Sequence, residues 1–215
     1  MDGLVLIIPA LNEAAVISEV VQSCKKVADV IVVDDGSVDG TGVLAANAGA
    51  QVIRHEINAG YDAALESGIL AGHSLGYRYA ITLDGDGQHS IICVEEVYKK
   101  LTSGFDLVCG VRDKKQRISE YIFGVFGNLV FGIKDPLCGL KGYSLSINEI
   151  RYPFNTFKSI GTELLFRVAK RQGLIAQLYV ITIPRADSSR FGGMFIANMR
   201  ILKSLLMTTI LCLKK

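Results

Sequence analysis

The feature that most constrains the fold is a series of four short apolar runs that alternate with helical segments over about the first 85 residues. The runs lie at residues 4–8, 30–33 and 51–54 and at a fourth segment that ends at Leu83. Continuous apolar runs are typical of parallel strands buried on both faces. Strands alternating with helices predict an α/β fold with a doubly wound, largely parallel sheet flanked by helices.

The second half of the chain has a less regular pattern. Helices are expected over residues 91–101 and 162–172, and strands over 106–110 and 175–183. Residues 116–133 combine aromatic residues and glycines in a looser pattern that fits either a helix or a mobile segment. Without an internal repeat or a low-complexity linker, the chain is predicted to form one domain over residues 1–192, followed by a helix over 193–215.

The C-terminal helix is mostly apolar, but Arg200 and Lys203 interrupt it. Each charge would cost about 2.5–3.5 kcal/mol at the centre of a membrane-spanning helix. The two residues are expected to share a helical face with Ser204. The pattern therefore favours an amphipathic helix that lies in the membrane interface. The alternative is a helix that packs on the domain or on a second subunit.

Composition excludes several classes of protein. The net charge of +2 argues neither for nor against nucleic acid, but no dense basic tract is present, and we expect no nucleic-acid partner. Five cysteines are scattered without a CxxC pair, which indicates packed thiols in a reducing compartment rather than a disulfide or zinc framework. The chain starts without a basic, cleavable leader, so a cytoplasmic location is expected.

Polar clusters follow three of the predicted strands, at residues 9–13, 34–37 and 84–88. Asn12 in the first cluster is also expected to cap the helix that follows. The carboxyl ends of parallel strands meet at one edge of a sheet, so the clusters predict a shared ligand site. The Asp84 and Asp86 carboxylates suit a divalent cation. The alternative for this segment is a tight turn, in which Asp and Gly are common.

The nature of the ligand follows from what the clusters lack and what they offer. Neither a GxGxxG fingerprint nor a P-loop follows these strands. Acceptors such as Asp35 suit a base or ribose, and Asp84 with Asp86 would hold a metal on a diphosphate. A nucleotide-diphosphate sugar is the natural candidate. A nucleotidylyltransferase is a weaker alternative, because the chain has no Gly-rich, lysine-bearing loop near its start.

Several motifs in combination resemble those of family 2 GT-A glycosyltransferases, and most closely the dolichol-phosphate mannose synthase and polyprenyl-phosphate glycosyltransferase type. The motifs span residues 5 to about 190. They are Ile8-Pro9-Ala10-Leu11-Asn12-Glu13, Val33-Asp34-Asp35-Gly36-Ser37, Asn58-Ala59-Gly60, Asp84-Gly85-Asp86-Gly87-Gln88-His89, Gly110-Val111-Arg112 and Asp135-Pro136-Leu137-Cys138-Gly139-Leu140-Lys141.

This resemblance implies a Rossmann-like GT-A fold and a set of site residues. The nucleotide pocket would be lined by Pro9, Ala10, Asn12, Glu13, Asp35 and Asp84. Asp84, Asp86 and Gln88 would coordinate Mg²⁺ or Mn²⁺ on the donor diphosphate, which makes Asp86 a catalytic residue. The metal would assist departure of the nucleoside diphosphate as a Lewis acid. The family inverts the anomeric centre by single displacement.

The acceptor side departs from the family pattern. Lys141 stands where the family has an arginine, which keeps the charge but loses the planar, bidentate fork. Arg112 and Arg190 are the other candidate phosphate ligands, and for each basic residue alone a solvated surface role is the alternative. A lipid phosphate needs no strong general base, whereas a sugar hydroxyl does. Glu163 is the candidate catalytic base, or else a first-turn glutamate favoured by the helix dipole.

The leading hypothesis is an inverting, metal-dependent transferase that moves a sugar from a nucleotide-sugar donor to a polyprenyl phosphate at the cytoplasmic face of the membrane. A homodimer or a separate membrane subunit is compatible with it. The alternatives are a transferase of the same fold that glycosylates a saccharide hydroxyl during surface-polysaccharide synthesis, and a non-catalytic partner that binds a nucleotide sugar.

Overall fold

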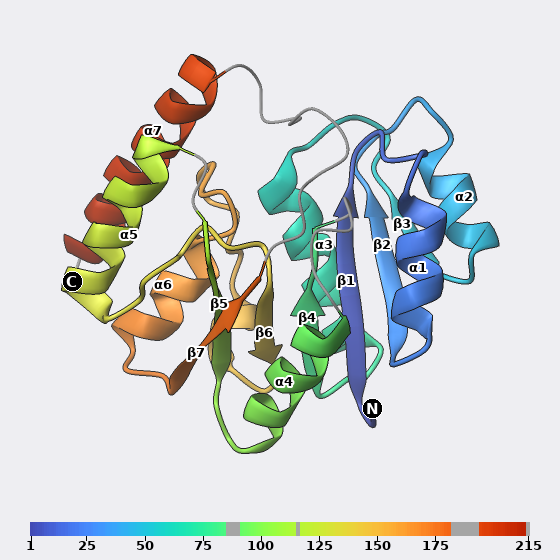
Figure 1. Ribbon diagram of the computed structural model, residues 1–215, viewed down its shortest axis with the longest axis horizontal. Helices are drawn as coiled ribbons and strands as arrows, with labels where there is room; N and C mark the ends of the chain where they lie inside the picture. Colours follow the sequence, from blue (N-terminus) through green and yellow to red (C-terminus); the bar gives the residue numbers. More distant parts are fainter. Residues whose placement is uncertain (85–90, 115–116, 182–193, 214–215) are drawn as a thin grey trace.

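The structure is a computed structural model of residues 1–215, and it describes residues 1–84, 91–114, 117–181 and 194–213. One sheet has the strand order β3-β2-β1-β4-β6-β5-β7 (Figure 1). The strands are β1 (Leu4–Ala10), β2 (Asp29–Asp34), β3 (Gln51–Arg54), β4 (Tyr79–Thr82), β5 (Leu107–Arg112), β6 (Lys141–Ser144) and β7 (Ile175–Val180). The helices are α1 (Ile17–Lys25), α2 (Thr41–Asn47), α3 (Tyr61–Ser74), α4 (Ile91–Thr102), α5 (Ile118–Phe131), η1 (Asn148–Arg151), α6 (Glu163–Lys170) and α7 (Met194–Leu213).

The mainly parallel sheet confirms the predicted fold class. Only β6 runs antiparallel to its neighbours in this sheet, between β4 and β5. This strand was not predicted. An antiparallel strand begins at the edge where its parallel neighbours end, so the start of β6 lies at the carboxyl edge of the sheet. Thr82 at the end of β4 pairs there with Lys141 at the start of β6.

Helices cover both faces of the sheet, as the continuous apolar strands require (Figure 1). Alternate residues of β1 point to opposite faces. Val5 and Ile7 join the cluster that contains residues of α3, α5, α6 and α7. Leu6 and Ile8 join the cluster that contains residues of α1, α2 and α4. The fold therefore has three layers, with α1, α2 and α4 on one side and α3, α5, α6 and α7 on the other.

Two local predictions are resolved by the structure. The segment 116–133, for which a helix and a mobile segment were both open, contains helix α5. The prediction that Asn12 caps the first helix was wrong, because α1 begins at Ile17 and Val16 occupies the cap position. Asn12 lies in a left-handed conformation with φ of 53°. Its side chain accepts a hydrogen bond from the Val38 backbone instead (3.0 Å).

Helix α7 lies beside α5 and also contacts α6 (Figure 1). Ile201 and Ser204 are buried on this packed face, whereas Arg200 and Lys203 are exposed. Ser204 is packed whereas both cations are exposed, so the prediction that they share its face was wrong; Lys203 points about 100° away from Ser204 around the helix, and Arg200 about 40° away. Within the described ranges, no helix combines the length and apolar character needed to cross a membrane.

Cys24, Cys93, Cys109 and Cys138 are free thiols. Cys24, Cys109 and Cys138 are buried. Burial raises the pKa of the Cys24 and Cys109 thiols to about 11.

Candidate active site

The first two predicted clusters lie side by side at the carboxyl ends of β1 and β2. The Asn12 backbone donates to Ser37 Oγ (2.9 Å), and the Glu13 backbone donates to the buried Thr41 Oγ1 (2.8 Å). Pro9 and Ala10 are buried at the end of β1 itself. The structure therefore brings the predicted nucleotide-binding residues of the two strand ends together through backbone and hydroxyl groups.

Asp35 is buried, and both oxygens of its carboxylate contact the segment that precedes α3. It accepts hydrogen bonds from the Ala59 and Gly60 backbones (2.9 and 2.8 Å). Nδ1 of His55 lies 2.7 Å from Oδ1 of the same carboxylate. Gly36 follows with φ of +80°, and an added Cβ would lie 2.8 Å from the Asn58 backbone nitrogen. The chain must therefore have glycine here for β2 to meet the 55–60 segment.

Asp84 follows β4 and lies at the same edge of the sheet. Its carboxylate rests directly on Gly139, where an added Cβ would come within 2.2 Å of Asp84 Oδ2. The Tyr61 hydroxyl lies 3.5 Å from Asp84 Oδ1. Burial, together with the negative charge of Asp84, raises the pKa of the Tyr61 hydroxyl.

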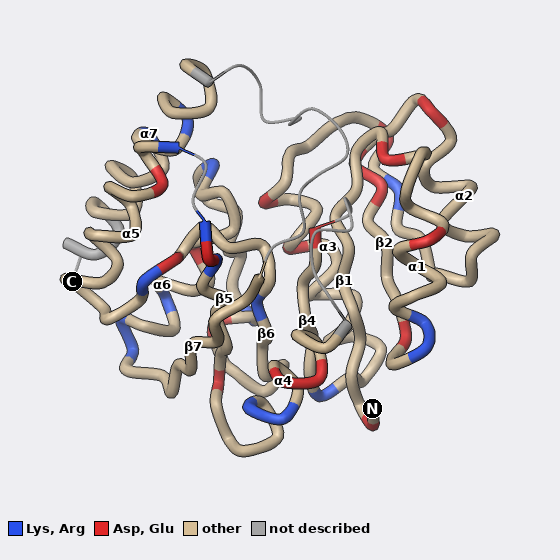
Figure 2. The backbone as a smooth tube through the Cα atoms, viewed as in Figure 1, with Lys and Arg blue, Asp and Glu red and all other residues tan. Residues whose placement is uncertain are grey.

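The predicted metal ligands can be assessed at Asp84 alone, because Asp86 and Gln88 lie outside the described residues. No group of three His, Cys, Asp or Glu side chains capable of holding a metal occurs within the described part of the chain. Asp84 fits the predicted role because a hard carboxylate sits at the end of a buried strand, in a space that the missing Cβ of Gly139 leaves open. Acidic segments gather near this edge, where β2 ends and α3 begins (Figure 2).

Lys141, a predicted phosphate ligand, opens β6 beside the end of β4. It is buried, and its Nζ donates to the backbone carbonyl of Cys138 (2.5 Å). Among the described residues, no carboxylate lies within ion-pair distance of this ammonium. A buried cation bonded to a neutral carbonyl is costly unless an anion comes close to it.

Arg112, the second predicted phosphate ligand, is already paired within the protein. Its guanidinium donates to both Asp135 oxygens (2.8 and 2.9 Å) and lies 3.2 Å from Glu120. Burial would lower the pKa of this guanidinium, but its hydrogen bonds to Asp135 and the charges of Asp135 and Glu120 raise the pKa overall. The third candidate, Arg190, lies outside the described residues.

Glu163, the candidate base, begins α6 and is buried. One carboxylate oxygen accepts from the Thr156 backbone (2.9 Å), and the other accepts from the Thr156 hydroxyl (2.6 Å) and from Arg167 (2.5 Å). The side chain therefore holds the loop that precedes its own helix. This placement matches the alternative of a structural first-turn glutamate.

The sequence did not single out the acidic face of α3, which holds the same loop. Asp62 accepts from the Ser159 hydroxyl and from the backbones of Ile160 and Gly161. Glu66 accepts from the Phe154 backbone and from the Asn155 amide. Two acids four residues apart on a helix repel each other unless they find donors elsewhere. That spacing was the signal from which these contacts could have been suspected.

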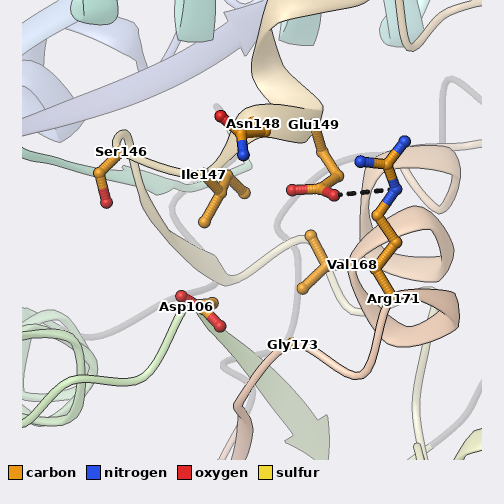
Figure 3. A pocket seen from close by; sticks show the side chains of 8 residues that line it. All are labelled: Asp106, Ser146, Ile147, Asn148, Glu149, Val168, Arg171 and Gly173. Carbon is orange, nitrogen blue, oxygen red and sulfur yellow. Dashed lines mark ion pairs between the residues drawn. The ribbon is translucent and has the colours of Figure 1, made fainter.

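A separate cavity of about 300 Å³ lies at the opposite edge of the sheet (Figure 3). Asp106 precedes β5 and Gly173 precedes β7, so this cavity is at the amino ends of the parallel strands. Glu149 and Arg171 form an ion pair on its wall, 3.3 Å apart. None of the predicted site residues that the structure describes lines this cavity.

Known proteins resemble this chain over most of its length. A sequence model described as "Glycosyl transferase family 2" matches residues 5–169. An uncharacterized protein of Methanocaldococcus jannaschii is 31% identical over 97% of this chain and 93% of its own. A dolichyl-phosphate hexose transferase of Haloferax volcanii is 26% identical over 88% of this chain and 86% of its own.

Solved structures share the fold at lower identity. A crystal structure of glucosyl-3-phosphoglycerate synthase from Mycobacterium tuberculosis, in complex with Mn²⁺, uridine diphosphate and glucosyl-3-phosphoglycerate, matches with a TM-score of 0.79. It is 23% identical and covers 95% of this chain and 79% of that chain. The similarity extends across the sheet and the helices on both of its faces.

Proposed function

The chain belongs to glycosyl transferase family 2, and we propose that it transfers a sugar, with inversion, from a nucleotide-diphosphate sugar to a polyprenyl phosphate. The observation that carries the acceptor class is Lys141, whose buried ammonium has no carboxylate within ion-pair distance among the described residues. A phosphate oxyanion would supply the missing counter-charge at the carboxyl edge. The similarity to a dolichyl-phosphate hexose transferase supports the same acceptor class.

The donor would bind along the ends of β1, β2 and β4. Asn12, Glu13 and Asp35 border the proposed nucleoside side of this edge, and Asp84 borders the diphosphate side. Mg²⁺ or Mn²⁺ held by Asp84, with Asp86 and Gln88, would neutralise charge on the departing nucleoside diphosphate. The M. tuberculosis enzyme of similar fold was crystallised with Mn²⁺ and uridine diphosphate, which supports a metal of this kind.

The engagement of Glu163 also supports a phosphate acceptor. Its two oxygens accept hydrogen bonds from Thr156 and Arg167. Glu163 could therefore take a proton from a sugar hydroxyl only after these contacts break. A phosphomonoester is already largely a dianion at neutral pH, since its second pKa is about 6. We therefore assign attack on the anomeric carbon to a phosphate oxygen without a general base.

Membrane contact is the other part of the proposal. The outer surface of α5 and α7, here called the α5–α7 surface, carries large apolar side chains. They are Ile118, Tyr121, Ile122, Val125, Leu129 and Val130 on α5, and Phe195, Ile196, Met199, Leu202, Leu206 and Ile210 on α7. Few charges interrupt it apart from the exposed Arg200 and Lys203 (Figure 2).

Apolar area that inserts below the headgroups, with cations at their level, is the pattern of an interfacial anchor. We place this surface on the cytoplasmic face of the membrane, where a lipid phosphate would reach the sheet edge. The alternatives are that a second copy of the chain, or a membrane subunit, packs on the α5–α7 surface.

The experiment is a donor screen of the purified full chain with Mg²⁺ or Mn²⁺, a labelled nucleotide sugar and vesicles that contain polyprenyl phosphate. Label on a phosphate-linked lipid is the expected product. Label on a glycan would instead assign the saccharide-hydroxyl activity. If no donor released its nucleoside diphosphate, the chain would instead be a non-catalytic protein that binds a nucleotide sugar.

Variants of Lys141 make the screen specific to the acceptor. Lys141→Gln should raise the KM for the lipid phosphate at least about tenfold, with Lys141→Arg restoring most of it. The melting temperature of Lys141→Gln should not fall, because this variant removes a buried charge that has only a carbonyl partner. Lys99→Gln, on the exposed side of α4, is the matched control and should change neither quantity.

A further inference from the structure

The first turn of α3 lies between two parts of the proposed site. Tyr61, the first residue of α3, points its hydroxyl at Asp84, with 3.5 Å between the oxygen atoms. The ring of the same tyrosine lies against Gly161, where an added Cβ would be 2.9 Å from Tyr61 Cε1. Tyr61 is thus confined between the strand-end carboxylate and the loop that precedes α6.

The adjacent residue fixes that loop. Asp62 accepts hydrogen bonds from the Gly161 backbone (2.8 Å) and the Ile160 backbone (3.1 Å). Both donors are in left-handed conformations, with φ of 57° at Ile160 and 70° at Gly161. A β-branched residue such as Ile160 adopts this conformation only when its surroundings impose it. The Asp62 carboxylate supplies that constraint, and it keeps Gly161 against the Tyr61 ring.

We propose that Tyr61 is a positioning residue for the metal centre, which orients the Asp84 carboxylate through its hydroxyl while Gly161 holds its ring. This inference rests on the proposed metal-dependent function. A hydroxyl that donates to the Asp84 carboxylate would restrict its orientation at the end of β4, where it would serve as a metal ligand. Partners of this kind commonly change metal affinity by about 10–100-fold when they are removed.

The test is a comparison of Mn²⁺ binding to the purified full-length chain and its Tyr61→Phe variant, without donor or acceptor. Electron paramagnetic resonance counts free Mn²⁺ directly, so the readout does not depend on turnover. Because the 3.5 Å contact is long, we expect the lower end of the range, with Mn²⁺ bound about tenfold more weakly by Tyr61→Phe.

Tyr77→Phe is the matched control, because Tyr77 also donates to a carboxylate, Asp29 (2.9 Å), but at the amino end of β2. It should bind Mn²⁺ like the wild type. Equal affinity of Tyr61→Phe and wild type would overturn the inference, as would an equal loss in both variants. If the wild-type chain did not bind Mn²⁺, the inference would fail, whereas the metal dependence of turnover is tested separately by the donor screen. Wild-type binding with an unaffected Tyr61→Phe would remove the inference alone.

Discussion

The guanidinium of Arg112 and the carboxylate of Asp135 form a two-point ion pair, with Nε and Nη2 donating at 2.8 and 2.9 Å. Asp135 is only 1% exposed, so this pair joins the end of β5 to the segment before β6 inside the protein. Glu120, at the start of α5, completes the cluster from a third element. The geometry makes Arg112 a structural cation that an acceptor phosphate could reach only in competition with two carboxylates.

Replacing Arg112 with glutamine should therefore reduce stability before it affects acceptor binding. Asp135 and Glu120 would remain buried without their common cation, and we expect the free energy of unfolding to fall by about 3–5 kcal/mol. Urea denaturation measures this change. Lys25→Gln is the control, because both side chains of its pair with Asp29 are exposed and the pair should contribute less than about 1 kcal/mol. An Arg112→Gln protein with wild-type stability and a raised KM for the lipid phosphate would contradict the structural role.

Gly139→Ala should impair the site while leaving the fold intact. The new Cβ would lie 2.2–2.4 Å from the Asp84 carboxylate, and that short side chain must swing away. A displacement of about 1 Å can reduce a rate by about 100-fold, so we expect a fall in kcat/KM of this order and a need for more metal.

Gly110→Ala, in the neighbouring strand β5, provides the contrast. Its Cβ would lie 2.6 Å from Cys138 Sγ and 3.1 Å from the Leu140 carbonyl, inside the packed sheet. This variant should lose stability, which thermal denaturation would detect. Full activity of Gly139→Ala at low metal concentration would show that Asp84 does not act where the structure places it.

The sequence was sufficient for the first half of the fold because parallel strands buried on both faces are continuous apolar runs. It was insufficient for β6, since Lys141-Gly142-Tyr143-Ser144 has no apolar run and is a strand only through its pairing with β4 and β5. The site shows the same division. The strand-end clusters were predicted to meet, whereas the Asp135 partner of Arg112 and the Thr156 partner of Glu163 lie in loops that no local pattern specifies.

The pH dependence of turnover distinguishes the two acceptor chemistries. With a lipid phosphate, the rate should fall as the pH drops through about 6, because protonation of the phosphomonoester removes the attacking dianion. Glu163→Gln should keep this profile and most of the rate, although its buried pair with Arg167 is lost and stability falls. The measurement is kcat/KM for the lipid phosphate against pH for both proteins. A loss of more than about 100-fold in Glu163→Gln, with a changed profile, would instead identify Glu163 as a general base.

Substitutions on the α5–α7 surface should weaken membrane binding without unfolding the chain. Leu129 and Leu206 are 78% and 61% exposed, so a glutamate at either position is tolerated in water. Insertion of a leucine side chain contributes about 1.5–3 kcal/mol, so each substitution should lower affinity for anionic vesicles by about 10-fold or more. Vesicle co-sedimentation measures this affinity. Val43→Glu is the control, because Val43 is 60% exposed on α2, at the other end of the molecule from α5 and α7 (Figure 1).

The same variants separate a membrane from a protein partner. If the α5–α7 surface meets a bilayer, wild-type binding should decrease when anionic lipid is replaced by neutral lipid, since Arg200 and Lys203 each contribute about 1 kcal/mol near a charged surface. If a second copy of the chain covers the surface, analytical ultracentrifugation would show a dimer that Leu129→Glu dissociates. Vesicle binding that Leu129→Glu and Leu206→Glu leave unchanged would exclude the α5–α7 surface as the membrane contact.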